Sequence, residues 1–222
     1  MTDRSRDFEA AKVEDFALAL NFVPVIYLAI GTLLLFQVDG LIFKIGVGVT
    51  WIFGVPLLLY RLIIFIWGEP QGKGLEQSSR AFKVWWVSTQ IQMVFNRFPF
   101  FEEVIRLLPG VYVLWLRLWG SNVSAKSFWG PGSRVLDRGM VDVEDGAVIG
   151  MQAVLSPHLG RLDSKGNHVV DVARIRIGQS AIIGGRACIG PGCAIGRQEE
   201  FPAGRLLKPF TKWSGGRKVA NE

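Results

Sequence analysis

The sequence predicts two kinds of structure in series: an N-terminal transmembrane helical hairpin and a C-terminal parallel β-solenoid. Two long apolar runs occupy the first third of the chain, and a six-residue repeat rich in glycine lies near its end. A period of six matches neither the 3.6 residues of a helical turn nor the two-residue alternation of a lone strand, and it is typical of stacked β-coils. The chain has 222 residues and a mean hydropathy of +0.30, which is more apolar than a soluble domain of this charge content.

The net charge of +6 limits the classes of partner. Lysine and arginine flank the apolar runs and crowd the C-terminal tail, which suits anionic lipid or an anionic cofactor. Nucleic acid is not indicated, because no binding motif accompanies the charge. The two cysteines, Cys188 and Cys193, both lie inside the repeat, so the sequence predicts no disulfide framework.

The apolar runs cover residues 16–38 and 41–67 and follow a polar segment without a cleavable signal. Each run is long enough to cross a hydrocarbon core of ~30 Å. Lys44 and Arg61 lie near the ends of the second run, where long side chains reach the interface. The alternative is a pair of buried helices in a soluble domain.

Loop charge predicts the orientation of this hairpin. The turn between the runs contains Asp39 and has one nearby lysine, Lys44, whereas three basic residues precede the first run and three follow the second. The positive-inside rule therefore places both termini and the solenoid in the cytoplasm, as in a multi-pass membrane protein. The basic residues are Arg4, Arg6 and Lys12 before the hairpin, and Lys73, Arg80 and Lys83 after it.

Residues 68–120 are expected to connect the hairpin to the solenoid. The segment 68–80 is a polar linker of turn residues. The segment 81–118 is rich in Trp, Phe, Leu and Arg and is divided by Pro99, which is typical of amphipathic helices that lie in the membrane interface. The alternative is that these aromatic residues pack on the base of the solenoid.

The repeat is clearest between residues 177 and 196, where an isoleucine recurs every six residues and a glycine follows each one. The isoleucines are expected to stack inward, coil upon coil, into a narrow apolar core. Ala181, Ala187 and Cys193 recur at the position expected to fill the tight corner. The glycines would allow unusual backbone angles and a close approach between chains.

Earlier coils follow the same spacing less regularly. One series with six-residue spacing contains Val123, Trp129, Val135 and Val141, and the phase then slips by two residues. The next series contains Val143, Ile149 and Leu155. We expect such a slip to be a bulge or loop at a corner of the solenoid.

These motifs resemble the hexapeptide-repeat acyltransferase family, whose domains are left-handed parallel β-helices. The apolar segment 107–120 and the closing phrase 201–204 further resemble the membrane-attached acyltransferase-like terminal domain of poly-lysine-synthetase-type peptide synthetases. The resemblance implies a homotrimer that uses acetyl-CoA or another acyl-CoA. The expected units are 1–67 (tail and two transmembrane helices), 68–120 (linker and interfacial helices), 121–200 (β-helix) and 201–222 (basic tail).

The segment 156–173 interrupts the repeat and contains both histidines, His158 and His168. Long excursions from a regular scaffold are common sites of function. The family resemblance implies that a histidine just past an inward aliphatic residue is the catalytic base, and His158 after Leu155 has that place. A neutral imidazole is a suitable general base at neutral pH. Asp163 and Asp171 are the candidate carboxylates for orienting its ring, and a structural role is the alternative for each of these residues.

The resemblance also implies where acyl-CoA binds. The pantetheine would run beside the repeat near Gly184, Gly185 and Ala187, and the adenosine phosphates would lie near the basic residues Arg205, Lys208 and Lys212. Leu207 and Phe210 replace a glycine and an alanine of the family's closing phrase. The alternative for the basic tail is attraction to membrane lipid headgroups.

The sequence therefore predicts a membrane-anchored acyltransferase that moves an acyl group from acyl-CoA to a hydroxyl or amine acceptor. A second hypothesis is a non-catalytic trimeric scaffold in a membrane complex, which the irregular early coils would permit. A zinc carbonic anhydrase of similar shape requires three histidine ligands per site, and the chain has two histidines. No metal is expected.

Overall fold

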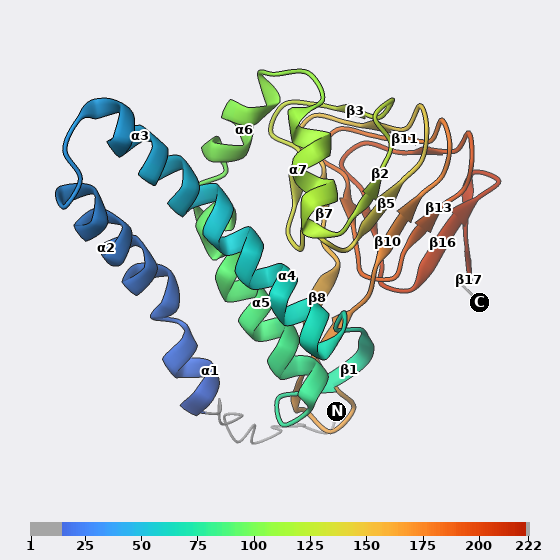
Figure 1. Ribbon diagram of the computed structural model, residues 1–222. Helices are drawn as coiled ribbons and strands as arrows, with labels where there is room; N and C mark the ends of the chain where they lie inside the picture. The colour runs from blue at the N-terminus through green and yellow to red at the C-terminus, as the bar shows by residue number, and fades with distance from the viewer. Residues whose placement is uncertain (1–14, 221–222) are drawn as a thin grey trace.

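A layer of helices lies against one end of a coil of short strands in the computed structural model, which describes residues 15–220 (Figure 1). Predictions that rest on Arg4, Arg6 and Lys12 lie outside the described residues. The helices are α1 (Asp15–Leu20), α2 (Val23–Phe36), α3 (Leu41–Val49), the π-helical turn η1 (Thr50–Gly54), α4 (Val55–Trp67), α5 (Arg80–Arg97), α6 (Phe100–Arg106) and α7 (Val111–Trp119).

The first two apolar runs form a helical hairpin. Asp15–Phe36 and Leu41–Trp67 are 22 and 27 residues long and are apolar enough to cross a membrane by length and composition. The second helix passes through η1 because Pro56 has no backbone N–H to donate, and Val55 donates to Thr50 instead. Only 6% and 11% of the two apolar stretches are buried, so they are not core helices of the described fold.

The C-terminal half is a parallel coil with three faces. Face 1 contains β2 (Asn122–Val123), β5 (Val141–Val143), β10 (Ile175–Ile177), β13 (Ala194–Ile195), β16 (Thr211–Ser214) and the antiparallel β17 (Arg217–Ala220). Face 2 contains β3 (Phe128–Trp129), β6 (Val148–Ile149), β11 (Ile182–Ile183) and β14 (Glu200–Phe201). Face 3 contains β4 (Arg134–Val135), β7 (Val154–Leu155), β12 (Cys188–Ile189) and β15 (Leu206–Leu207). The predicted order, helices followed by parallel strands, is confirmed.

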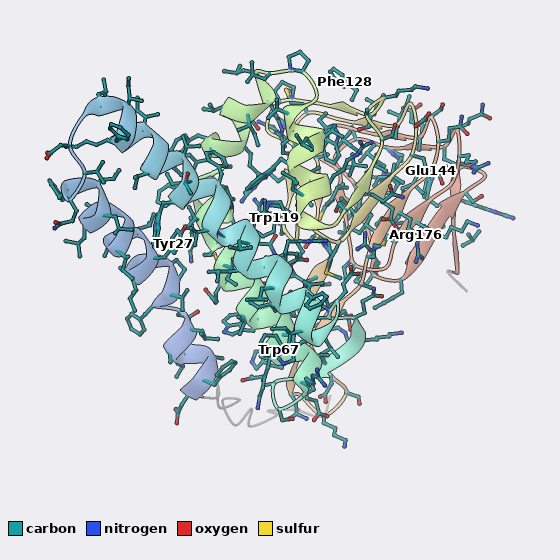
Figure 2. All side chains as sticks on the ribbon, viewed as in Figure 1. Tyr27, Trp67, Trp119, Phe128, Glu144 and Arg176 are labelled. Carbon is teal, nitrogen blue, oxygen red and sulfur yellow. The ribbon has the colours of Figure 1, made fainter. Side chains whose placement is uncertain are left out.

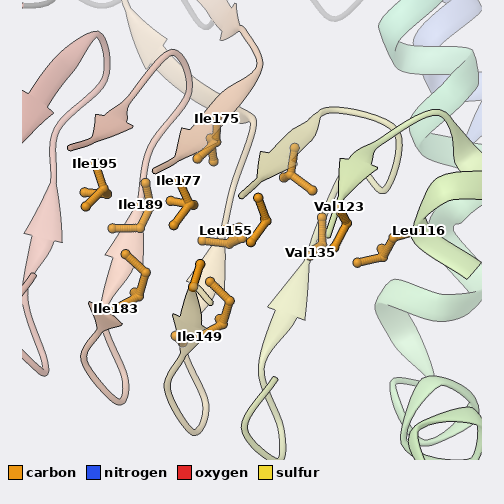
Figure 3. Close-up of a cluster of buried hydrophobic side chains, with 14 of the residues drawn as sticks. Leu116, Val123, Val135, Ile149, Leu155, Ile175, Ile177, Ile183, Ile189 and Ile195 are labelled. Atoms are coloured by element: carbon orange, nitrogen blue, oxygen red, sulfur yellow. The ribbon is translucent and has the colours of Figure 1, made fainter. Parts of the chain in front are cut away.

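The inward residues stack in the predicted register. Val143 pairs with Ile177 and Ile177 with Ile195 on face 1. Val143 rather than Val141 pairs with Val123, so the extra residues precede Val141, whereas the spacing placed the slip after it. Figure 3 shows Ile177 and Ile195 among the aliphatic side chains that point into the interior of the coil. Ala181, Ala187 and Cys193 are almost fully buried, as expected for corner positions.

The glycines of the repeat serve close approach rather than unusual backbone angles. A Cβ at Gly184 would overlap the backbone of Ala203 in the next coil, and one at Gly150 would overlap the backbone near Ile183. Positive φ angles occur two residues after each such glycine instead, as at Gln152 (58°) and Arg186 (58°). The sequence prediction was therefore right about packing and wrong about which position adopts the left-handed conformation.

Aromatic residues of the helical layer close the end of the coil. Phe95 of α5 and Trp115 and Trp119 of α7 are buried in the same cluster as Val123 of the first coil. Figure 2 shows Trp119 between α4 and the coil. The alternative reading, in which aromatic residues pack on the base of the coil, is confirmed for these three side chains. Phe98 and Phe100 are exposed.

The linker after the hairpin and the excursion form a small side sheet. The linker was expected to be irregular, but it contains β1 (Gly72–Glu76), which pairs with β9 (His168–Val172). The strand β9 in turn pairs with β8 (His158–Leu162) in an antiparallel hairpin. Leu75, Val170 and Val172 pack on Phe82 and Trp85 of α5, so apolar burial holds the excursion against the helical layer.

Replacement of one stacked isoleucine should destabilise the coil. Ile183 is fully buried, so Ile183→Ala should lower the free energy of unfolding by about 2–5 kcal/mol. Its neighbour Ile182 is 43% exposed, so Ile182→Ala serves as the matched control and should cost about 1 kcal/mol or less. Urea unfolding followed by tryptophan fluorescence measures both, and equal losses would contradict the inward and outward assignments.

Candidate active site

The phase slip and the excursion lie at the same corner of the coil, between face 3 and face 1. The chain from β4 to β5 turns this corner in the first coil, and the excursion between β7 and β10 leaves from it in the second. Val135 pairs with Leu155 in register, so the residues that follow these two are brought together. We call residues 136–140 the corner loop.

Asp137 of the corner loop contacts His158 at the start of the excursion. The distance between Asp137 Oδ2 and His158 Nδ1 is 2.5 Å. The carboxylate is buried, with 3% of its side chain exposed, whereas 22% of the imidazole side chain is exposed. Because Nδ1 faces the carboxylate, Nε2 is the nitrogen left for proton exchange with another group.

Helix α5 covers this pair. The rings of Trp85 and His158 are 5.0 Å apart between centroids, and Thr89 donates a long hydrogen bond of 3.5 Å to the other oxygen of Asp137. His158 shares a face of the side sheet with Val172, its partner in the register, and that face packs on α5. The imidazole therefore lies between the side sheet, the corner loop and α5.

The environment of His158 changes its pKa in two opposing ways. Burial lowers the pKa of His158, whereas the charge of Asp137 and its hydrogen bond raise it, and the resulting pKa lies above the ordinary value of 6.5. A carboxylate on Nδ1 also fixes the tautomer that has its free lone pair on Nε2. The arrangement is that of an oriented general base.

The two carboxylates that the sequence proposed for orienting His158 have other partners. Asp163 lies in the hairpin turn and accepts from the backbone N–H of Lys165 and of Asn167, each at 2.8 Å. The hydrogen bond from the Asn167 backbone is the main cause that lowers the pKa of Asp163.

Asp171 likewise serves the side sheet. It accepts two hydrogen bonds from Arg161, at 2.8 and 3.0 Å, and one from the Gly74 N–H at 2.7 Å. Successive residues of a strand point to opposite faces, so Asp171 points away from the face that His158 shares with Val172. Asp137 is therefore the carboxylate in contact with His158, whereas Asp163 and Asp171 are bonded to other groups. His168 pairs with Leu162, at the far end of the hairpin.

The sequence contained a signal for Asp137 that the spacing argument did not use. A two-residue slip places its extra residues at a corner, and the next interruption of the repeat begins one coil later at the same corner. Residues that follow paired inward positions are neighbours in space. Comparison of the two interruptions would have predicted that Asp137 lies next to His158.

Residues proposed to bind acyl-CoA lie at other parts of the coil. Gly184, Gly185, Ala187 and Arg205 belong to turns between face 2 and face 3, so face 3 separates them from His158 within one chain. Ala187 is fully buried. Lys208 lies in the turn between face 3 and face 1, and Lys212 lies on β16.

A polar groove of about 780 Å³ runs over face 1. Charged side chains of both signs line it, including Asp142, Glu144, Arg176, Arg197 and Lys212. Figure 2 labels Glu144 and Arg176 on this side of the coil. His158 is not among its lining residues. Within residues 15–220, no group of three or more His, Cys, Asp or Glu side chains is arranged to bind a metal ion.

Comparisons with known proteins give structural likeness at low scores. No protein-family model and no curated protein matches the chain. A hexapeptide-repeat acetyltransferase from Vibrio cholerae, complexed with acetyl-CoA, is 18% identical over 46% of this chain and 60% of that chain, with a TM-score of 0.34. Serine acetyltransferase from Neisseria gonorrhoeae, in complex with serine, is 11% identical over 89% and 96%, with a TM-score of 0.30.

An N-acyltransferase from Bacillus cereus, in complex with dTDP and coenzyme A, is 15% identical over 43% of this chain and 61% of that chain, with a TM-score of 0.20. The chain thus spans about three fifths of the length of the Vibrio and Bacillus enzymes. At these identities and TM-scores the comparisons assign neither a family nor an activity to this chain. The resemblance to the synthetase-terminal domain stays a prediction.

Removal of the Asp137 charge should lower the pKa of His158. In Asp137→Asn the burial of the imidazole is unopposed, so the pKa should fall below its value in the unchanged protein. The measurement is an NMR titration of the histidine Cε1–H signals, in which His168 is the internal control. The opposite shift, or none, would show that the pair does not form in solution.

The same substitution should change the pH dependence of stability. The folded-state pKa of His158 is raised, so the pair stabilises the fold fully below about pH 6.5 and this contribution is lost as the pH rises through the folded-state pKa. The difference in free energy of unfolding between the unchanged protein and Asp137→Asn should therefore shrink as the pH rises. Urea midpoints measured from pH 5.5 to pH 9 test this; a constant difference would contradict it.

Proposed function

We propose that this chain is a membrane-anchored acyltransferase of the hexapeptide-repeat, left-handed β-helix type, with His158 as the general base. The observation that supports it most is the buried Asp137 carboxylate on Nδ1 of a partly exposed imidazole, at the one corner where the coil is interrupted twice. Acyl transfer from a thioester requires one such base, whose neutral form accepts a proton as the acceptor attacks.

The proposed reaction uses Nε2 of neutral His158. As a hydroxyl or amine of the acceptor attacks the thioester carbonyl of acetyl-CoA or another acyl-CoA, its proton moves to Nε2 and the carbonyl oxygen gains negative charge. When the tetrahedral intermediate collapses, the carbon–sulfur bond breaks, and coenzyme A leaves as the thiol after taking up the proton from Nε2, which returns His158 to its neutral form. Asp137 stabilises the imidazolium between these steps.

A homotrimer would explain how acyl-CoA reaches the base. The glycine turns near Gly184 and Gly185 lie on the other side of face 3 from His158, so a neighbouring copy is needed if the pantetheine runs along those turns. Arg205, Lys208 and Lys212 are then the candidate partners of the adenosine phosphates. Membrane lipid headgroups are the alternative partner of these basic residues.

The membrane hairpin is part of the proposal. Its apolar surface is exposed, Asp39 lies in its turn, and the exposed basic residues Lys73, Arg80 and Lys83 follow its second helix. We propose that both termini and the coil lie in the cytoplasm.

A non-catalytic scaffold is the second candidate, and one observation favours it. Trp85 covers His158, and α5 leaves only 22% of the imidazole side chain exposed. A scaffold would bind no acyl-CoA. Calorimetry with acetyl-CoA, palmitoyl-CoA and free coenzyme A distinguishes the two, since a well-folded protein that binds none of them is a scaffold.

Loss of the imidazole should abolish acyl transfer. His158→Ala should reduce turnover by about 10²–10⁴-fold, the usual contribution of a general base. His168→Ala removes the other histidine and serves as the matched control, with turnover unchanged. The assay follows release of coenzyme A thiol in the presence of membrane extract as the source of acceptors. Equal turnover in the His158→Ala variant would refute the assignment of the base.

Reporter fusions test the orientation. Alkaline phosphatase fused after residue 222 should be inactive, because the enzyme requires export to fold, and green fluorescent protein at the same place should fluoresce. Fusions within the turn at Asp39 should show the reverse pattern if the hairpin crosses the membrane. An active C-terminal phosphatase fusion would contradict the proposed topology.

A further inference from the structure

The phase slip adds two residues to the first coil, and neighbouring side chains of the corner loop point to different partners. Asp137 turns to His158, whereas Arg138 turns into the helical layer. Arg138 is 1% exposed and is one of the largest fully buried side chains among the described residues. The proposed mechanism uses Asp137 and leaves Arg138 without a role.

One stripe of α5 faces the corner loop. Trp85, Thr89, Gln92 and Asn96 are spaced four, three and four residues apart, so they share one side of the helix. Trp85 contacts His158 and Thr89 contacts Asp137, as described above. Gln92 Oε1 accepts from the Arg138 backbone N–H at 2.8 Å.

Asn96 adds two more contacts to the same loop. Its side-chain N–H donates to the carbonyl oxygen of Leu136 at 3.3 Å, and its side-chain oxygen accepts from Arg138 at 3.0 Å. The loop therefore has hydrogen bonds from α5 on both sides of Asp137.

The guanidinium of Arg138 makes a bidentate pair with Glu102 of α6. Both nitrogen–oxygen distances are 2.8 Å, and Glu102 is 4% exposed. Trp115 of α7 donates to the same carboxylate at 3.0 Å. A planar fork of this kind allows little rotation of the side chain, so Arg138 links the corner loop rigidly to α6 and α7.

We propose that Arg138 and Glu102 are positioning residues that hold Asp137 against His158, so that the helical layer is a working part of the active site. This inference rests on the proposed function for its effect on turnover, but not for its effect on the imidazole. The alternative is that the buried pair contributes to stability alone. In that case its removal would leave the pKa of His158 unchanged.

The other charged groups near His158 belong to pairs of their own. They are Arg161–Asp171 in the side sheet, and Arg174 after β9, which pairs with Glu69 and Asp142 and donates to the carbonyl oxygen of Gly139 in the corner loop. Substitutions at the Arg138–Glu102 pair remove none of these charged groups. A change in the titration of His158 would therefore report the position of Asp137.

The principal test replaces both members of the pair. The variant Glu102→Gln with Arg138→Met removes two opposite charges at once, so no buried charge is left unpaired. We expect the pKa of His158 to fall toward its value in Asp137→Asn, and the signals of His168 serve as the internal reference. Turnover at the pH optimum should fall about 10- to 100-fold, in kcat more than in KM, because the base is displaced rather than lost.

The control is Glu103→Gln. Glu103 is adjacent to Glu102 in α6, but it pairs with Arg106 and accepts from the Gly132 N–H rather than contacting the corner loop. It should leave the pKa of His158 and turnover unchanged. A double variant that is folded, by its near-UV circular dichroism, and has an unchanged His158 pKa would overturn the proposal.

A second variant decides the matter if the double variant does not fold. Arg138→Lys keeps both charges but replaces the planar fork with a single ammonium, so it loses the bidentate geometry and should lower the pKa of His158 by a smaller amount. No shift in this variant would also overturn the proposal. The NMR readout requires no turnover, so failure of the acyltransferase assignment, seen as unchanged activity in His158→Ala, is distinguishable from failure of the positioning role.

Discussion

The stacking of one aliphatic side chain over its equivalent in the next coil constrains everything else in the C-terminal half. Because Val135, Leu155 and Ile189 must lie in one row, extra residues leave the coil only at its corners. The slip and the excursion both do so between face 3 and face 1. This shared corner brings Asp137 to His158 across a sequence separation of 21 residues. The candidate site is thus a product of the register and not of the excursion alone.

Much of this architecture is readable from the sequence, because a repeat of period six has few structural solutions. The inward rows, the buried corner residues and the existence of a two-residue slip all follow from spacing. The contact between Asp137 and His158 does not follow from spacing, since Asp163 and Asp171 are nearer to His158 along the chain. The strand alternation that turns Asp171 away becomes visible only in the paired hairpin. Likewise, the positive φ angles at Gln152 and Arg186 could not be predicted, because neither Gln nor Arg is a residue type that indicates a left-handed backbone conformation.

The helical layer was the harder part to predict. An aromatic, weakly amphipathic segment such as α5 suits a membrane interface as well as a buried contact, and its composition does not separate the two. The structure places α5 between the hairpin and the coil: Gln90 bonds Asn21 near α2, and Phe95 contacts Phe53 of the second apolar helix. Its polar stripe is therefore buried against the corner loop. Thr, Gln and Asn side chains at helical spacing in α5 were the available sign of a buried polar contact. They could be interpreted in this way only once the corner loop was known to be irregular.

The pairing of β1 with β9 has a consequence for the order in which the molecule is made. The Gly74 N–H and the Asp171 carboxylate are joined across 97 residues. At about 5–20 residues per second, the ribosome releases the linker roughly 5–20 s before its partner strand exists. During that interval the membrane hairpin and α5 have been synthesised, but the excursion that packs on α5 has not. The side sheet that packs on α5 can therefore form only after the strands of the first two coils have been synthesised.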